Sequence, residues 1–398
     1  MLMRFLVFLL ALGASTAAYA QNQSAPESGC YLLQSRTIGE SIRAQGGITR
    51  FYQLDDEAST QDAGDYGFYL RRADPRDPFF LLKDGRGDYL RASNAMASGD
   101  SMPNDDSLLR VQPAGNGAWT LTAKASGRRL RARVDIFVGH RIDFSTITDE
   151  ATEFLLVPAE GCRNPWVEDE PALGTTAAAL VSDPNEPIVG LADVHNHIFS
   201  NVGFNGDLIS GYGHHPLGAL VALDDCGEEH GSLGLGDLVG GFQRGDFDGH
   251  ATRGFPDAAH PAHNDFNHQQ SYYRWLERAH RGGLRLIVML GTSNTGACVL
   301  NRSSPDLDCD DMAAIDRQLD AAYELVEYVD MYNGGPGRGW FQIADSPSEA
   351  RQLIAEGKMA VVLGIETAEL FGCIAGKGCT ETDVEEALDI YRDRGVRY

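Results

Sequence analysis

The sequence predicts a chain of two domains, an all-β domain followed by an α/β domain. One pattern of paired apolar segments occurs three times between residues 30 and 162, which indicates repeated β-hairpins. From residue 188 onward, short apolar runs alternate with amphipathic stretches of helical period, as is typical of parallel strands covered by helices. A chain of 398 residues, 43% of them hydrophobic, is long enough to bury two or three separate cores.

The first twenty residues have the features of a secretory signal peptide (residues 1–20). Met1–Arg4 is a short start with a basic residue, residues 5–12 are an apolar run, and Ala18-Tyr19-Ala20 is a small-x-small cleavage site. No later stretch reaches about eighteen uninterrupted apolar residues, so the sequence predicts no transmembrane anchor. We therefore expect a soluble, exported protein that is secreted or periplasmic.

The charge balance is strongly acidic. There are 57 Asp and Glu residues against 33 Lys and Arg residues, a formal net charge of −24. This charge argues against nucleic acid and against anionic membrane surfaces as partners. Because the surplus acid is spread along the chain, it indicates a role in solubility.

The seven cysteines are interpreted in the light of export. An oxidising compartment favours disulfides over metal ligation. Three pairs are suggested by position: Cys30 with Cys162, Cys298 with Cys309, and Cys373 with Cys379. Cys226 is left over, and the odd count indicates that a partner cysteine is missing from this chain. Spacing alone leaves the connectivity open.

Three segments of the first domain share an apolar strand, a polar or glycine turn, and a second strand that ends in apolar-Arg-Ala. They are residues 30–44, 79–92 and 119–132, and a shorter apolar echo accompanies them at residues 67–70, 107–110 and 153–156. Three units of about forty residues, each built of hairpins, predict a β-trefoil over residues 30–162. The pattern resembles the fascin-like and ricin-like lectin folds. A generic β-sandwich is the alternative, and the three-fold repetition disfavours it.

The ligand of this domain is open. Trefoils often bind sugars on an aromatic platform, and Tyr89 and Trp119 are candidates, but their alternating strand positions favour core packing. The arginine that recurs at positions 43, 91 and 131 favours repeated structural hydrogen bonds over a ligand site. A glycan stays a candidate partner.

Residues 163–187 are rich in Pro, Ala and acidic residues and predict a linker. Beyond it, buried strands are predicted at residues 188–194, 283–292 and 358–366. Helices are predicted at residues 270–280, 310–332, 346–357 and 380–395, the last two with N-terminal capping signals. Residues 396–398 have the pattern of the first residues of a further strand.

These elements predict the N-terminal part of an α/β (β/α)₈ barrel, or TIM barrel, over residues 188–398, with a long loop insertion at residues 198–282. Such a barrel has eight strands and about 250 residues. We therefore expect the sequence to stop in mid-barrel and the chain as given to be inactive. A smaller open α/β sheet is the alternative.

The first of these strands ends in Val194-His195-Asn196-His197. Residues i and i+2 of a strand project to the same face, so His195 and His197 point together from the carboxyl end, where barrel enzymes hold metal ions. Glu366 ends a later strand, and a carboxylate buried there needs a partner. We predict these three residues as metal ligands. The alternatives are chance spacing for the histidines and a salt bridge to an arginine for Glu366.

The segments Val194–His197 and Val362-Leu-Gly-Ile-Glu366 resemble the renal (membrane) dipeptidase family, a binuclear zinc (β/α)₈ barrel of the amidohydrolase superfamily. Residues 391–398 resemble the stretch that leads into that family's next strand. The resemblance implies two zinc ions in a complete site, with His195 and His197 as ligands and Glu366 as the bridging carboxylate. The family's two further histidine ligands and its catalytic Asp have no counterpart here. His197 also stands where the dipeptidases have Asp, which is closer to the general amidohydrolase pattern.

The insertion contains eight of the eleven histidines. Loops that follow barrel strands build the substrate pocket, which makes His214, His215 and His230 candidates for substrate binding. Ordinary loop hydrogen bonding is the alternative for each of them.

Together these features predict a secreted metal-dependent hydrolase of amide or peptide bonds, dipeptidase-like, that uses a metal-activated water on a small-molecule or peptide substrate. A lactonase or esterase on the same barrel is one alternative. A secreted carbohydrate-binding protein with an inactive barrel is the other. The catalytic acid/base residue is expected beyond residue 398.

Overall fold

The structure is a computed structural model that describes residues 25–45, 51–74, 76–93, 96–135, 139–163, 183–206, 208–223, 267–269, 271–301, 306, 308–374, 376 and 378–398. The chain divides into two compact units, Met1–Pro165 and Trp166–Tyr398, each with its own hydrophobic core. The predicted signal peptide and residues 164–182 of the predicted linker lie outside the described residues.

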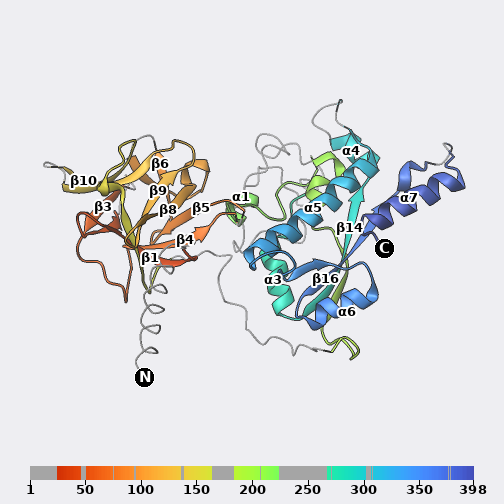
Figure 1. Cartoon of the computed structure of the whole chain (residues 1–398). Helices are drawn as coiled ribbons and strands as arrows, with labels where there is room; N and C mark the ends of the chain where they lie inside the picture. The colour runs from red at the N-terminus through yellow and green to blue at the C-terminus, as the bar shows by residue number, and fades with distance from the viewer. Residues whose placement is uncertain are drawn as a thin grey trace, which may run out of the picture. The chain divides into compact units, whose positions relative to one another are not determined.

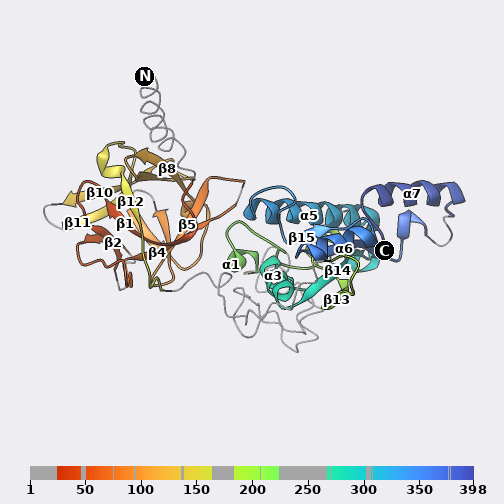
Figure 2. The ribbon, with the colours of Figure 1, turned by 60° about the horizontal axis from the view of Figure 1, so that its bottom comes forward.

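The first unit contains a closed ring of six antiparallel strands. Within it, β1 pairs with β4 and β12, β5 pairs with β4 and β8, and β9 pairs with β8 and β12. The six strands, labelled in Figures 1 and 2, are β1 (Gly29–Ser35), β4 (Gly67–Arg72), β5 (Phe79–Asp84), β8 (Leu109–Gly115), β9 (Ala118–Ala123) and β12 (Phe154–Pro158). A closed ring leaves none of these strands with an unpaired edge.

Three further hairpins complete this unit. They are β2 (Ser41–Ala44) with β3 (Tyr52–Asp55), β6 (Tyr89–Ser93) with β7 (Met96–Asp100), and β10 (Arg129–Asp135) with β11 (Gly139–Ser145). The three predicted repeats coincide with β1–β2, β5–β6 and β9–β10, and their echoes with β4, β8 and β12. A six-stranded barrel with three hairpins is the β-trefoil architecture. The trefoil prediction is confirmed, and the β-sandwich alternative is wrong.

The core explains the sequence repeat. The alanines that end the three apolar-Arg-Ala motifs, Ala44, Ala92 and Ala132, are all buried in one hydrophobic cluster. Tyr89 and Trp119 are 1% and 8% exposed, so neither presents a ring face to a sugar. Their predicted core role is confirmed.

The recurring arginines each bind an aspartate. The pairs are Arg43 with Asp55 (3.2 Å), Arg91 with Asp100, and Arg131 with Asp149 (2.9 Å). The hydrogen bonds from Arg131 hold the pKa of the Asp149 carboxyl below its usual value. The predicted structural hydrogen bonds are confirmed at all three positions.

A disulfide between Cys30 and Cys162 joins the two ends of the trefoil, as predicted.

The second unit is built on a four-stranded parallel sheet in the order β13–β14–β16–β15. Its strands are β13 (Leu191–Asn196), β14 (Leu284–Ser293), β15 (Phe341–Ile343) and β16 (Met359–Thr367). The described helices are α1 (Ala219–Ala222), α3 (Tyr273–Arg281), α4 (Thr295–Asn301), α5 (Asp311–Tyr332), α6 (Pro347–Ala355) and α7 (Glu381–Asp393). Figure 1 shows α5 running across β14, and its apolar residues share a core with Val361 and Leu363 of β16. Among the described residues, no helix is both long and apolar enough to cross a lipid bilayer.

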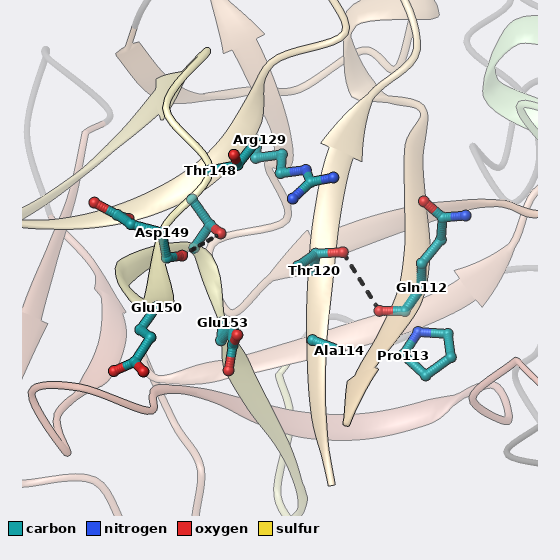
Figure 3. Close-up of a pocket in the computed structure, with 10 residues that line it drawn as sticks. Gln112, Pro113, Ala114, Thr120, Arg129, Thr148, Asp149, Glu150 and Glu153 are labelled. Carbon is teal, nitrogen blue, oxygen red and sulfur yellow. Dashed lines mark hydrogen bonds between the residues drawn. The ribbon is translucent and has the colours of Figure 1, made fainter. Parts of the chain in front are cut away.

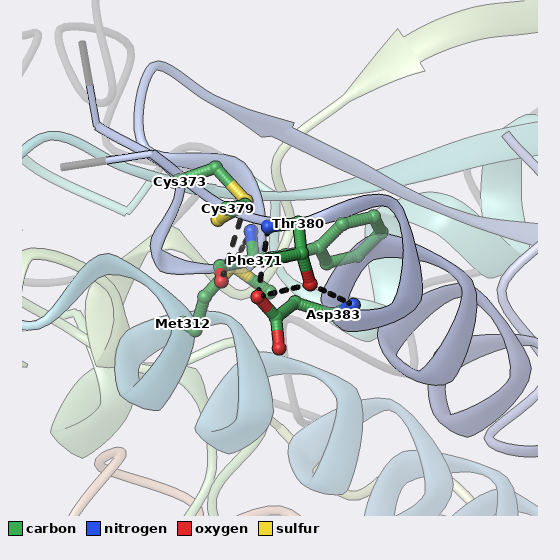
Figure 4. The surroundings of a disulfide bond; sticks show 6 residues. All are labelled: Met312, Phe371, Cys373, Cys379, Thr380 and Asp383. Atoms are coloured by element: carbon green, nitrogen blue, oxygen red, sulfur yellow. Dashed lines mark hydrogen bonds between the residues drawn. A yellow bond between two sulfur atoms is a disulfide. The ribbon is translucent and has the colours of Figure 1, made fainter. Parts of the chain in front are cut away.

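Local signals set the helix boundaries where the sequence predicts them. The Ser346 side chain accepts a hydrogen bond from the backbone N–H of Glu349 at the start of α6. Thr380 and Asp383 form a capping box at the start of α7. The predicted Cys298–Cys309 and Cys373–Cys379 disulfides are present, and Figure 4 shows the second beside this capping box. Cys226 lies outside the described residues.

The predicted buried strand at residues 188–194 is wrong in one respect, because β13 is largely exposed. Leu191 and Val194 are 69% and 64% exposed. Within the described residues, β13 pairs with β14 alone, so it is an edge strand. An apolar run identifies a strand but carries no information on whether another element covers it.

The edge of β16 opposite to β14 also differs from the prediction. The short strand β15, which is not among the strands predicted from the sequence, pairs with Met359–Val361. Val396 forms a parallel bridge with Leu363 on the same edge, as predicted for the start of a further strand. The full (β/α)₈ barrel stays a prediction.

Candidate metal centre

The carboxyl ends of β13 and β16 bring together the three predicted metal ligands. Nε2 of His195 is 3.1 Å from Oε2 of Glu366, and Nε2 of His197 is 3.3 Å from the same oxygen. The two Nε2 atoms are 3.0 Å apart. Among the described residues, this is the one group of His, Cys, Asp or Glu side chains whose ligand atoms converge in this way.

The sheet explains the convergence. Strand β14 joins the two strand ends, because it pairs with Asn196 through Met289 and with Glu366 through Thr292. Side chains alternate along β16, so Glu366 projects from the face opposite to that of Leu363, which packs against α5. The carboxylate therefore lies at the end of the sheet, on the face that α5 does not cover, and the Glu366 side chain is 50% exposed.

A hydrogen bond orients the His197 ring. Its Nδ1 lies 3.1 Å from the backbone carbonyl oxygen of Leu290, and a carbonyl only accepts, so Nδ1 carries the proton. A neutral His197 then turns the lone pair of Nε2 toward Glu366 and His195. A lone pair facing a carboxylate is repelled, and a proton or a cation between the atoms relieves that repulsion, so the geometry is compatible with a bound metal ion.

A β-bulge shapes the end of β13. From Asp193 to Asn196 the strand advances three residues, while its partner β14 advances two, from Ile287 to Met289. The Asp193 carboxylate accepts hydrogen bonds from the backbone N–H of His195 (3.1 Å) and from Nδ2 of Asn196 (2.9 Å). It therefore holds the irregular backbone on which His195 stands. Asp193 is not among the residues predicted from the sequence, although an Asp two residues before a backbone N–H is a common acceptor for it.

Helix α5 anchors the other side of the centre. Thr367, next to Glu366, donates from Oγ1 to Oδ2 of the buried Asp311 at 2.6 Å. The fully buried Gln318 donates to the carbonyl of Thr292 at 2.8 Å and accepts from its N–H at 3.0 Å. Thr292 of β14 is the ladder partner of Glu366 of β16. The carboxyl ends of β14 and β16 are therefore both hydrogen-bonded to α5.

The spacing and chemistry of the three donors fit a metal ion. Zinc binds nitrogen and carboxylate oxygen at about 2.0–2.2 Å, which places neighbouring ligand atoms about 3–3.5 Å apart. The observed separations are 3.0–3.3 Å. Three protein ligands are also the number that catalytic zinc sites use, with a further position left for water or substrate. Among the described residues, the charged or ionisable side chains that contact the Glu366 carboxylate are the two histidines and no arginine, in contrast to the salt-bridge alternative.

The other predicted histidines lie elsewhere or outside the described residues. Nε2 of His214 is 4.0 Å from a carboxylate oxygen of Glu324 on α5. On α5, Glu324 is thirteen residues, or about 20 Å, from Asp311, which lies beside the candidate metal centre. His214 is therefore remote from the three predicted ligands. Burial, and next the charge of His214, lower the pKa of the neighbouring His215. His230 is not among the described residues, and the substrate-binding role of all three stays a prediction.

No protein-family model and no curated protein matches this chain. Three solved structures each align with about a third of it. Among solved structures, the designed three-fold symmetric protein ThreeFoil aligns with a TM-score of 0.28 and 20% identity, over 32% of this chain and 98% of its own. SeviL bound to asialo-GM1 saccharide has a TM-score of 0.29 and 14% identity, over 33% and 99%. A Polyporus squamosus lectin has a TM-score of 0.29 and 13% identity, over 33% and 50%. The trefoil assignment rests on the strand pairing above.

Proposed function

We propose that the second unit belongs to a metal-dependent hydrolase of amide or peptide bonds, and that its metal is zinc. The observation that supports the proposal is the convergence of two imidazole nitrogens and one carboxylate oxygen within 3.0–3.3 Å. The resemblance of residues 194–197 and 362–366 to renal dipeptidases supports the same reaction class. That resemblance also implies a second zinc ion, which Glu366 would help to hold.

Each side chain has a distinct role in this proposal. His197, with its proton held on Nδ1 by Leu290, offers Nε2 to the ion, and His195 offers a second nitrogen. Glu366 supplies an oxygen donor and negative charge. Zinc, when bound, supplies an activated water and polarisation of a carbonyl group. The side chains of His195 and Glu366 are 59% and 50% exposed, so a substrate reaches them from solvent.

The same donor set suits an ester or lactone, because polarisation acts on either carbonyl. A lactonase or esterase is therefore the alternative within the same reaction class. Full-length protein assayed on dipeptides and on lactones separates the two, since the preferred substrate has the larger kcat/KM.

Zinc titration of the metal-free full chain by isothermal calorimetry tests the centre. We expect saturable binding of at least one zinc ion per chain, and a loss of affinity on the order of tenfold or more for both His197→Ala and Glu366→Gln. Glu324→Gln, which removes an exposed carboxylate on α5 beside His214, is the matched control and should bind zinc as the unmodified chain does. Equal affinity of Glu366→Gln and the unmodified chain would exclude this centre. Zinc-dependent dipeptide hydrolysis by the full-length protein, lost in the same two variants, then tests the reaction.

Carbohydrate binding by the trefoil is a second candidate function. A polar hollow of ≈ 650 Å³ in the third repeat favours it. A glycan panel probed with the Glu366→Gln full chain separates this function from hydrolysis. Glycan binding that survives the substitution supports it, and absence of binding to every glycan contradicts it.

A further inference from the structure

Three positions of the trefoil are equivalent by strand register but carry different side chains. Ser41, Tyr89 and Arg129 each begin the first strand of a hairpin. Their ladder partners on the preceding barrel strands are Gln34, Lys83 and Thr122. One position of the fold therefore has three different local surfaces, and the repeats serve as internal comparisons.

In the third repeat this position is open. Arg129 lines a hollow of ≈ 650 Å³ between strands β8 and β9 and residues 148–153. Figure 3 shows its guanidinium between that segment and the strand that carries Thr120, with Gln112 on the neighbouring strand. Pro113 and Ala114 add an apolar part to the lining.

The charges in this hollow leave one cation available. Among the described residues, the Arg129 side chain has no ion pair or hydrogen bond. Two acidic side chains of the lining are already bound, Asp149 by Arg131 and Glu153 by Arg36. Arg129 thus offers its donors to a ligand, and Glu150 and the Gln112 amide offer acceptors.

The equivalent positions of the other repeats lack this combination. In the second repeat, Tyr89 is 1% exposed and fills the space, and Arg71, which stands where the third repeat has Gln112, is also buried. In the first repeat, a hollow of ≈ 130 Å³ is lined by Ser41 and Asp56, and no basic side chain lines it. An open volume and an available cation occur together in the third repeat.

We propose that the third-repeat hollow binds one neutral, hydroxyl-rich sugar unit of a glycan, an inference that rests on the second candidate function above. A sugar hydroxyl both accepts and donates, so one unit can accept from Arg129 and donate to Glu150 or to the oxygen of Gln112. The C–H face of its ring fits the apolar surface of Pro113 and Ala114.

The lining also selects against anionic sugars. Arg131 and Arg36 already bind Asp149 and Glu153, so the charges left in the lining are those of Arg129 and Glu150, which balance each other. A neutral sugar keeps this balance, whereas a uronic acid adds a negative charge that Glu150 and the net charge of −24 on the whole chain oppose.

The test is calorimetric titration of the full chain with a panel of neutral methyl hexosides and N-acetylhexosamines, with glucuronic acid as the anionic probe. We expect at least one neutral sugar to bind and glucuronic acid to bind more weakly. Arg129→Ala should lower affinity on the order of ten- to a hundredfold, and Arg129→Lys, which keeps the charge but loses the forked donors, should retain part of it. Glu150→Ala should weaken binding, whereas Asp56→Ala, the same change in the first repeat, should not.

The outcomes separate this inference from the candidate function on which it rests. Full affinity in Arg129→Ala, checked for folding by circular dichroism, overturns the third-repeat hollow while glycan binding by the trefoil stands. Tighter binding of glucuronic acid than of every neutral sugar overturns the assigned ligand class. Absence of binding to any sugar of the panel overturns both. Arg129→Tyr, which copies the second repeat, should abolish binding by filling the space, and it keeps the test decisive if the alanine variant folds poorly.

Discussion

In the trefoil every barrel strand pairs on both sides, whereas in the α/β unit β13 pairs with β14 alone within the described residues. The closed ring contains three repeats with the same strand pairing, and the proposed sugar site lies where one repeat differs from the others, at Arg129. The parallel sheet has no such repetition among the described residues, and its candidate metal centre lies where strand ends meet, at His195 and Glu366. We therefore expect substitutions in the closed barrel to affect stability most, and substitutions at the exposed sheet end to affect metal binding most.

Removal of the Cys30–Cys162 disulfide should give the largest loss of stability. This bond spans a sequence separation of 132, against 6 for Cys373–Cys379. Chain entropy then predicts losses of about 5 and about 2 kcal/mol for the two serine double variants. Urea denaturation of the full chain, with each unit followed by hydrogen exchange, measures both. Equal losses would show that the trefoil does not depend on the closure of its ends.

A truncation in the closed barrel should cost more than one on the open edge. Phe154 of β12 is 0% exposed in the trefoil core, and Phe154→Ala should lower the free energy of unfolding by about 3–5 kcal/mol. Val194 of β13 is 64% exposed, and Val194→Ala should change it by no more than about 0.5 kcal/mol. Urea denaturation tests the contrast. A loss above about 2 kcal/mol for Val194→Ala would mean that β13 is covered in the full chain.

The trefoil was predictable because its three repeats place the same residue type at equivalent core positions. Three alanines occupy one equivalent buried position, and that constraint appears in the sequence as apolar-Arg-Ala at 44, 92 and 132. The hollow in the third repeat was not predictable. Ser41, Tyr89 and Arg129 have nothing in common as residues, and only the strand register shows that they are equivalent.

The candidate metal centre was predictable in its side chains and not in its supports. Alternation along a strand placed His195 and His197 together, and a strand-terminal carboxylate completed the group. The Leu290 carbonyl that orients His197 is a backbone group and has no sequence signature. The bulge at Asp193 depends on pairing with a distant strand, as does the exposure of β13. The three residues of β15 are too few to show a period.

Asp193→Ala should weaken zinc binding at the candidate metal centre while leaving the stability of the sheet nearly unchanged. Without its carboxylate, the backbone N–H of His195 loses its acceptor, and zinc affinity should fall about tenfold while the urea midpoint changes little. Asp183→Ala is the matched control, because Asp183 accepts from the N–H of Asn185 at 2.8 Å in the same way, away from the ligands. Calorimetric zinc titration of both variants makes the comparison. Equal zinc affinity in the two would limit Asp193 to a local turn.

The titration of His215 should have the smallest effect, and its sign is defined. Burial, followed by the charge of His214, lowers the pKa of His215, and its Nδ1 accepts from the N–H of Leu217 at 3.0 Å, so the folded state favours the neutral ring. Below about pH 6.5 the unfolded chain therefore binds more protons, and the stability that this group contributes above that pH is lost as the pH falls toward the lower folded pKa. His215→Gln should flatten the dependence of the urea midpoint on pH between about pH 5 and pH 7 in the α/β unit, and the trefoil transition of the same samples is the internal control. An unchanged slope in the variant would show that His215 titrates alike in the folded and unfolded states, which contradicts the prediction.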